Sequence, residues 1–303
     1  MPRDPHASRD NPPVTAATSP VADPTPVDAD HTLADHTLVD THCHLDMPPL
    51  DSRPVEILAA ARRAGVGVVI TVGIDPPSSE KAVALAARHA GVFATVGIHP
   101  HNVAAVTDDD YIKLRALVAG GNGSRVVAYG EIGLDFVKLR APADLQVVHF
   151  RRQLRLAREL ELPIIIHDRE AHDLTLAILA EEGPFPAGGV MHCFSGDMRL
   201  AEQVIELGLL ISIPGIVTFN SAAALREVAR QLPLSSLLLE TDAPFLAPVP
   251  RRGRTNEPAF LPFTANKVAE LRQETLAAVA RATTANAIRL FRLEERGERL
   301  DGN

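Results

Sequence analysis

The chain has 303 residues, of which 46% are hydrophobic and 22% are charged, and its formal net charge is −8. This mixture is typical of a globular protein, and it excludes a wholly disordered, collagen-like or disulfide-scaffolded chain. Because acidic residues outnumber basic ones, the charge also argues against a broad basic surface that holds nucleic acid by bulk attraction.

The cellular compartment is indicated by the cysteines and by the apolar runs. Cys43 and Cys193 are too few for a disulfide framework and fit a reducing compartment. The N-terminal residues lack the apolar core of a secretory signal, and no run approaches the roughly 18 apolar residues of a membrane helix. We therefore expect a soluble, cytoplasmic protein with no membrane partner.

Residues 1–36 differ in composition from the rest of the chain. They contain seven prolines and almost no large apolar side chains. Six aspartates against two arginines give this segment half of the net charge of −8. Such a segment buries too little surface to offset the entropy lost on ordering. We expect a disordered, acidic, proline-rich tail over 1–36 and a second flexible tail over 294–303.

Between these tails, short β-branched runs alternate with longer amphipathic ones. The predicted strands are Thr37–Thr41, Val66–Val72, Phe93–Ile98, Val126–Ile132, Pro163–Ile166, Gly189–His192, Leu209–Ile213 and Leu237–Thr241. The predicted helices are 54–64, 78–90, 107–119, 142–161, 170–182, 198–207, 221–230 and 264–282. Eight strand–helix units favour an α/β fold, a single-domain (β/α)8 TIM barrel over 37–293. An open doubly wound sheet is the alternative, weakened because no GxGxxG follows the first strand.

A barrel of this kind carries its chemistry on the C-terminal ends of its strands. The first predicted strand leads into VDTHCHLD, where His42 and His44 are two residues apart and so share one face of an extended chain. Two imidazoles on one face can chelate a divalent ion. Cys43, which alternates with them, is expected to be a small buried side chain rather than a ligand.

Metal-ligating residue types stand at five of the predicted strand ends: His42, His44, Glu131, His167, His192 and Asp242. A further carboxylate, Asp135, is predicted to lie in the loop after the fourth strand. Any one of these histidines is more often structural, but their joint placement predicts a metal site. Imidazole and carboxylate suit zinc, manganese, cobalt or iron, and magnesium less well, so the sequence leaves the metal open.

Six ligands are more than one catalytic ion needs if positions for water and substrate are to stay open. Two divalent metal ions that share a bridging carboxylate account for all six. Glu131 is the natural bridge, because its strand faces the first strand across the barrel. Two such ions would activate a water and clamp the oxygens of a phosphoryl group.

Several long segments resemble a known family. The segments are DTHCHLD, TVGIHPH, GEIGLDF, LPIIIHDREA, HCFSGD and LETDAPFLAPVPRRGRTNEP. Their order is similar to that in the TatD family of metal-dependent deoxyribonucleases. The resemblance covers residues 38–293. It implies a (β/α)8 barrel related to the amidohydrolases, a two-metal site, and cleavage of DNA phosphodiester bonds, often from a 3′ end as in a 3′-5′ exonuclease.

The resemblance also implies roles for individual residues. One ion would take His42, His44, Glu131 and Asp242, and the second would take Glu131, His167 and His192. Asp242 also suits a general base that orients the attacking water. Asp242 and Glu131 are therefore the expected catalytic residues.

Substrate contacts are expected from two further segments, at His99, His101, Arg251, Arg254 and Asn256. The two histidines of GIHPH could contact the scissile phosphate or the leaving group, or could be structural. Arginines of the RRGRTNEP loop could pair with phosphate. The alternative is a loop held by ion pairs with Glu257, and the sequence does not decide between them.

The aromatic residues limit the expected substrate. Phe194 and Phe245 follow ligand positions and could stack on a base, although packing beneath the loops is favoured. With two tyrosines and no tryptophan, a large stacking platform is not expected. We therefore expect DNA ends or short single strands as the substrate. The sequence gives no indication of protein partners.

Two other functions compete with a nuclease. A related metallohydrolase would act on small phosphate esters, amides or lactones, but many such barrels bridge their metals with a carboxylated lysine where this chain has Glu131. A binding module with a structural metal would need a closed site, whereas this ligand set is open and rich in histidine. The nuclease is therefore the favoured function.

Overall fold

A computed structural model describes residues 37–120 and 125–294 of the chain. The chain divides into two units, Met1–Thr32 and Leu33–Asn303, and all the described residues belong to the second. The predicted tail over 1–36 lies outside the described residues, as does all of the predicted tail over 294–303 except Glu294.

Eight parallel strands form one sheet, in which each strand pairs with the next along the chain. They are β1 (Leu38–Cys43), β2 (Val66–Val72), β3 (Val92–Val96), β4 (Val126–Asp135), β5 (Ile164–Arg169), β6 (Gly189–Met191), β7 (Leu210–Ile213) and β8 (Leu237–Leu239). Directly after β8, Ala243 bridges Cys43, and its carbonyl accepts from the N–H of His44 at 2.7 Å. The last strand thus returns to the first, which confirms the predicted (β/α)8 barrel.

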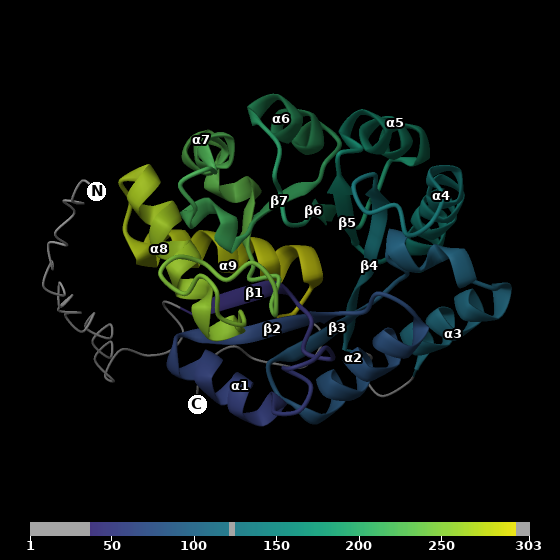
Figure 1. The fold of residues 1–303 in the computed structure, drawn as a ribbon, viewed down its shortest axis with the longest axis horizontal. Coiled ribbons are helices and arrows are strands. Elements are labelled where there is room, and N and C mark those ends of the chain that lie inside the picture. The colour runs from purple at the N-terminus through teal and green to yellow at the C-terminus, as the bar shows by residue number, and fades with distance from the viewer. Residues whose placement is uncertain (1–36, 121–124, 295–303) are drawn as a thin grey trace, which may run out of the picture. The chain divides into compact units, whose positions relative to one another are not determined.

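The helices follow the strands and surround the sheet (Figure 1). They are α1 (Pro54–Arg63), α2 (Pro76–Arg88), α3 (Asp108–Ala119), α4 (Ala143–Glu159), α5 (His172–Glu182), α6 (Met198–Glu206), α7 (Ala223–Gln231), α8 (Leu261–Arg272) and α9 (Leu276–Phe291). Side-chain caps start several of them; for example, Asp75 accepts from the N–H of Ser78, and Asp197 accepts from the N–H of Leu200. Within the described residues, no helix is both long and apolar enough to cross a membrane.

Two predictions about elements were wrong. The helix predicted over 264–282 is two helices, because Gln273 adopts the left-handed conformation (φ 56°) and ends α8, and the Thr275 side chain then caps α9. The fourth strand was predicted to end at Ile132 but continues through Asp135. Asp135 therefore lies on β4 and not in the following loop.

Helix α9 lies against the N-terminal ends of the strands. The Thr284 hydroxyl donates to the carbonyl of Thr37, just before β1, and the Asn286 amide donates to that of Leu237 at the start of β8. Its side chains join a buried apolar cluster with residues from the strands: Val39, Val68, Ile70, Phe93, Val127, Ile165, Val190 and Leu238, with Ala287, Leu290 and Phe291 of α9. The helix therefore closes the end of the barrel opposite to the strand ends that carry the predicted ligands.

Removal of a buried side chain from α9 should destabilise the whole barrel. Phe291 is 1% exposed, so Phe291→Ala should leave a cavity and cost about 3–5 kcal/mol of unfolding free energy, measured by urea titration. Leu276→Ala, at a site 36% exposed on the same helix, is the control and should cost less than about 1 kcal/mol. Equal losses in the two variants would contradict the closing role.

Candidate metal centre

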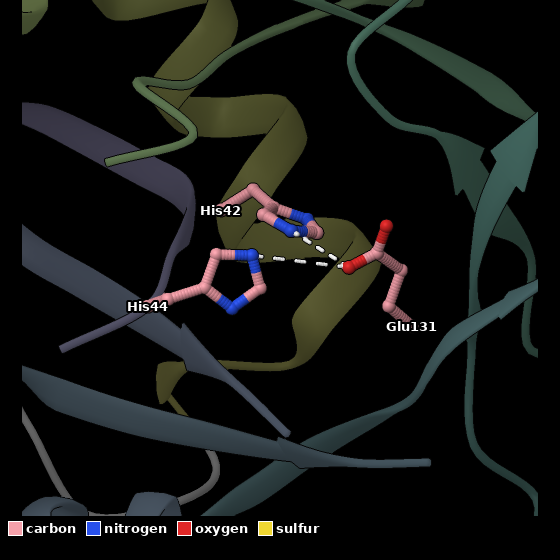
Figure 2. A group of neighbouring side chains, drawn as sticks. All are labelled: His42, His44 and Glu131. Carbon is pink, nitrogen blue, oxygen red and sulfur yellow. Dashed lines mark ion pairs between the residues drawn. The ribbon is translucent and has the colours of Figure 1, made fainter. Parts of the chain in front are cut away.

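The predicted ligands converge around the carboxylate of Glu131. Its Oε2 lies 3.4 Å from Nε2 of His42 and 3.9 Å from Nε2 of His44, and Figure 2 shows both rings turned toward it. Its Oε1 lies 2.7 Å from Nδ1 of His167 and 2.7 Å from Nε2 of His192. Each oxygen of one carboxylate thus faces its own pair of imidazoles.

Asp242 approaches this group from the segment after β8. Its Oδ1 lies 3.6 Å from Nε2 of His44 and 3.9 Å from Nε2 of His42. Its backbone N–H donates to the carbonyl of His42 at 2.9 Å, so the same contact that closes the barrel places the carboxylate. The structure therefore brings together all six residues predicted as metal ligands.

Irregular strand register aims two of these side chains. Pairing shifts by one residue between Asp40 and Cys43 on β1, and again between Tyr129 and Ile132 on β4. An extra residue bends a strand and redirects its side chains, and His42 and Glu131 lie within these two shifts. Gly133 also matters: a Cβ there would lie 1.9 Å from the carbonyl oxygen of His167, so glycine lets β4 run this close to β5.

Electrostatics keep Glu131 ionised in spite of its burial. Burial alone raises the pKa of a carboxyl group, but His192, His99 and His167 outweigh it and hold the pKa of Glu131 well below its ordinary value. In the same way, burial lowers the pKa of the His192 imidazole, but the Glu131 carboxylate outweighs it and raises that pKa well above its ordinary value. The centre is a buried anion among imidazoles.

Second hydrogen-bond partners orient the histidines. Nδ1 of His44 lies 3.1 Å from the carbonyl oxygen of Val72, which can only accept, so Nδ1 carries a proton and Nε2 is the nitrogen that can bind a metal. Nε2 of His167 lies 3.4 Å from Oδ2 of Asp135, which leaves Nδ1 free to face Glu131. Outer acceptors that fix a tautomer in this way are usual for metal-binding histidines.

This donor set fits divalent metal ions. Four imidazole rings and the carboxylates of Glu131 and Asp242 face one another, and both kinds of group are ligands for a divalent cation. Within the described part of the chain, neither ring nitrogen of the fully buried His42 makes a hydrogen bond, although such groups are normally satisfied. Imidazole nitrogen and carboxylate oxygen suit zinc and manganese.

His99 also lies near Glu131 but differs from the other histidines. Distance alone groups His99 with Glu131 and His167 as ligands of one ion. However, Nδ1 of His99 accepts from the backbone N–H of His101 at 3.0 Å, and burial lowers the pKa of the His99 ring well below its ordinary value. The neutral ring therefore carries its proton on Nε2, 3.5 Å from Oε1 of Glu131, and offers a hydrogen-bond donor rather than a lone pair.

Two buried carboxylates of the centre were missed as site residues in the sequence. Glu240 is fully buried, with its Oε1 3.6 Å from Nδ1 of His192 and accepting from the backbone N–H of Cys193 at 2.6 Å. Asp135 contacts His167 and His101. Spacing was the available signal: Glu240 precedes Asp242 by two residues and Asp135 follows Glu131 by four, so each pair can share a strand face.

Three other residues predicted to contact substrate lie in different surroundings. Nε2 of His101 lies 2.8 Å from Oδ2 of Asp135, and Asp135 in turn contacts His167. The guanidinium of Arg251 lies 5.6 and 5.5 Å from the ring centroids of Phe260 and Phe263. Arg254 is exposed in the same loop, and its contact with substrate stays a prediction.

Asn256 faces the protein rather than the mouth of the barrel. It is fully buried, and its amide donates to the carbonyls of Thr241 and Phe245 at 2.8 and 2.6 Å. Its Oδ1 accepts from the N–H of Glu257. Asn256 therefore holds the loop after β8, and its contact with substrate stays a prediction.

A closed TIM barrel with histidines and carboxylates at its C-terminal mouth defines a class, the metal-dependent hydrolases built on this fold. The family model described as TatD related DNase matches residues 39–292. The chain belongs to this family, which confirms the resemblance found in the sequence.

Individual relatives agree with this assignment. The uncharacterized metal-dependent hydrolase YabD of Bacillus subtilis is 39% identical over 256 residues, which are 84% of this chain and 99% of that protein. The 3′-5′ ssDNA/RNA exonuclease TatD of Cronobacter sakazakii is 41% identical over 242 residues, 78% of this chain and 90% of that one. The crystal structure of the TatD homologue YjjV from Escherichia coli superposes with a TM-score of 0.80 at 34% identity, covering 84% of this chain and 98% of that one.

Substitution of Glu240 should weaken metal binding without unfolding the barrel. In Glu240→Gln the oxygen that accepts from Cys193 is kept, but the charge opposite His192 is lost. We expect affinity for zinc and for manganese, each measured alone by equilibrium dialysis, to fall about 10–100-fold. Glu257→Gln makes the same change in the loop after β8 and should bind as wild type does. Unchanged affinity for both metals in Glu240→Gln would show that this carboxylate does not orient His192.

Proposed function

We propose that this protein hydrolyses phosphodiester bonds of DNA, removing nucleotides from the 3′ end of single strands with a water activated by two divalent ions. Membership of the TatD related DNase family supports hydrolysis of DNA, and the relative named a 3′-5′ ssDNA/RNA exonuclease supports the direction of attack. The cytoplasm, where such a substrate is accessible, stays the predicted location.

The observation that carries the proposal is the division of imidazoles between the two oxygens of Glu131. His42 and His44 face Oε2, whereas His167 and His192 face Oε1. One ion would accordingly be held by His42, His44, Glu131 and Asp242, and the second by Glu131, His167 and His192. A single carboxylate that serves two ligand sets is the arrangement expected of a two-metal hydrolase.

When bound, two such ions would supply positive charge to the phosphodiester and make a water acidic enough to lose its proton near neutral pH. Asp242 is 9% exposed, slightly more than Glu131 at 3%, so it can reach a water at the mouth. Its carboxylate orients that water and accepts its proton. The N–H at Nε2 of His99 faces Glu131 at the centre. From there it donates to a phosphate oxygen and stabilises the negative charge that develops on that oxygen.

Removal of the shared carboxylate should abolish turnover. In Glu131→Ala we expect release of nucleotides from a 3′-labelled single strand to fall by more than about 100-fold, together with a loss of bound metal by elemental analysis. Glu56→Ala, at an exposed position on α1, is the control and should retain both. A Glu131→Ala enzyme of full activity would refute the bridging role. A wild-type enzyme that hydrolyses lactones or phosphate monoesters but no DNA would refute the nuclease.

Asp242→Asn separates the two roles given to Asp242. Asparagine keeps an oxygen ligand but accepts a proton far less readily, so the hydrolysis rate should fall more steeply than the metal content. Both are measured on the same preparation, by the strand assay and by elemental analysis. If the variant loses its metal in proportion to its activity, the general-base assignment fails and Asp242 is a ligand alone.

A further inference from the structure

One aromatic ring stands open beside the metal centre. The ring centroid of Phe245 lies 6.1 Å from that of His44, with the two planes at 67°, and the residue is 50% exposed. Among the large hydrophobic residues exposed in the described part of the chain, Phe245 is the single aromatic one. Phe194, considered with it in the sequence, is 1% exposed and belongs to the core.

The backbone of Phe245 is held on both sides despite this exposure. Its N–H donates to the carbonyl of Asp242 at 2.9 Å, and its own carbonyl accepts from the Asn256 amide at 2.6 Å. Farther along the loop, the N–H of Val249 donates to the Thr218 hydroxyl at 2.9 Å. An exposed ring on a fixed backbone is prepared for a ligand, because little freedom remains to be lost on binding.

The position of the ring relates it to the chemistry. Phe245 follows the ligand Asp242 by three residues, and its ring contacts the ligand His44. A phosphate held by ions at Glu131 and by His99 would leave the adjoining sugar and base on a path out of the mouth, and the ring of Phe245 stands beside that mouth, 6.1 Å from the ring of His44. An open phenyl ring in that path offers a flat apolar surface that any of the four bases can cover.

We propose that Phe245 is a stacking platform for the nucleobase adjacent to the scissile phosphodiester. This proposal rests on the proposed function and names the part of the substrate that the mouth recognises. It gives the enzyme a preference for a base at that position without a preference for one base over another.

The test compares wild type and a Phe245 variant on two substrates that differ in their terminal bases. Two 3′-labelled single strands are compared in otherwise identical form, one intact and one with abasic residues at its last two positions. For wild type, kcat/KM should be roughly tenfold higher on the intact strand. Phe245→Ala should lower kcat/KM on the intact strand by about the same factor and leave the abasic strand almost unchanged, because the two changes remove the same contact. Phe245→Trp should restore the preference.

Leu246→Ala is the matched control, since Leu246 is the next residue and is 38% exposed. This variant should keep the wild-type preference for the intact strand. If Phe245→Ala slows both strands equally, or neither, the ring does not contact a base and the stacking proposal is overturned while the nuclease stands. If wild type cleaves neither strand, the proposed function fails and the stacking proposal fails with it.

A binding measurement gives a second readout that needs no turnover. A strand with 2-aminopurine at its 3′ end loses fluorescence when that base stacks on an aromatic ring. Asp242→Asn protein, which we expect to bind the strand and to turn it over slowly, should quench this probe. The double variant Asp242→Asn with Phe245→Ala should still bind the strand. It should quench the probe at least fivefold less than the Asp242→Asn single variant does. Equal quenching in both proteins would overturn the proposal.

Discussion

The structure depends on one buried interaction, the carboxylate of Glu131 among imidazoles from three other strand ends. A buried charge is costly unless it is paired and hydrogen-bonded, and no single segment of this chain supplies enough partners for it. A closed barrel solves this problem, because parallel strands bring their C-terminal ends to one rim. His42 and His44 arrive from β1, and His167 and His192 arrive from β5 and β6. The metal centre and the closure of the barrel therefore depend on each other.

The two ends of the barrel are divided between stability and chemistry. At the N-terminal end, α9 covers an apolar cluster that contains no titratable side chain among its members. At the other end, buried polar groups accumulate around Glu131. Asp135 and Glu240 face His167 and His192 there, while neither ring nitrogen of His42 makes a hydrogen bond. Separation of this kind allows the charged end to carry strain, such as the left-handed backbone of Asp242, while the apolar end holds the fold.

Much of this arrangement could be predicted because it repeats along the chain. All eight strands, and the convergence of the six residues predicted as metal ligands, follow from alternation and from their place at strand ends. The break between α8 and α9 could not, since Gln273 ends the helix without a glycine or proline to signal it. Glu240 was missed because it acts through His192, and a contact between two side chains from different strands has no local pattern. The burial of Asn256 could not be predicted either, because the sequence of a loop has no periodicity that distinguishes buried from exposed positions.

The charge of the protein limits how it can hold a nucleic acid. The net charge is −8, so the chain lacks the excess of basic residues that attracts DNA to a protein surface over long distances. Affinity of that kind falls as the salt concentration rises. Under the proposed function, capture of a strand is local, at the centre around Glu131 and at the ring of Phe245. The loop after β8 links these two, because Asp242 and Phe245 are three residues apart and are joined by a hydrogen bond. Since the other metal-ligand positions lie at the ends of strands and not on this loop, its sequence can change what is bound while the hydrolytic centre stays as it is.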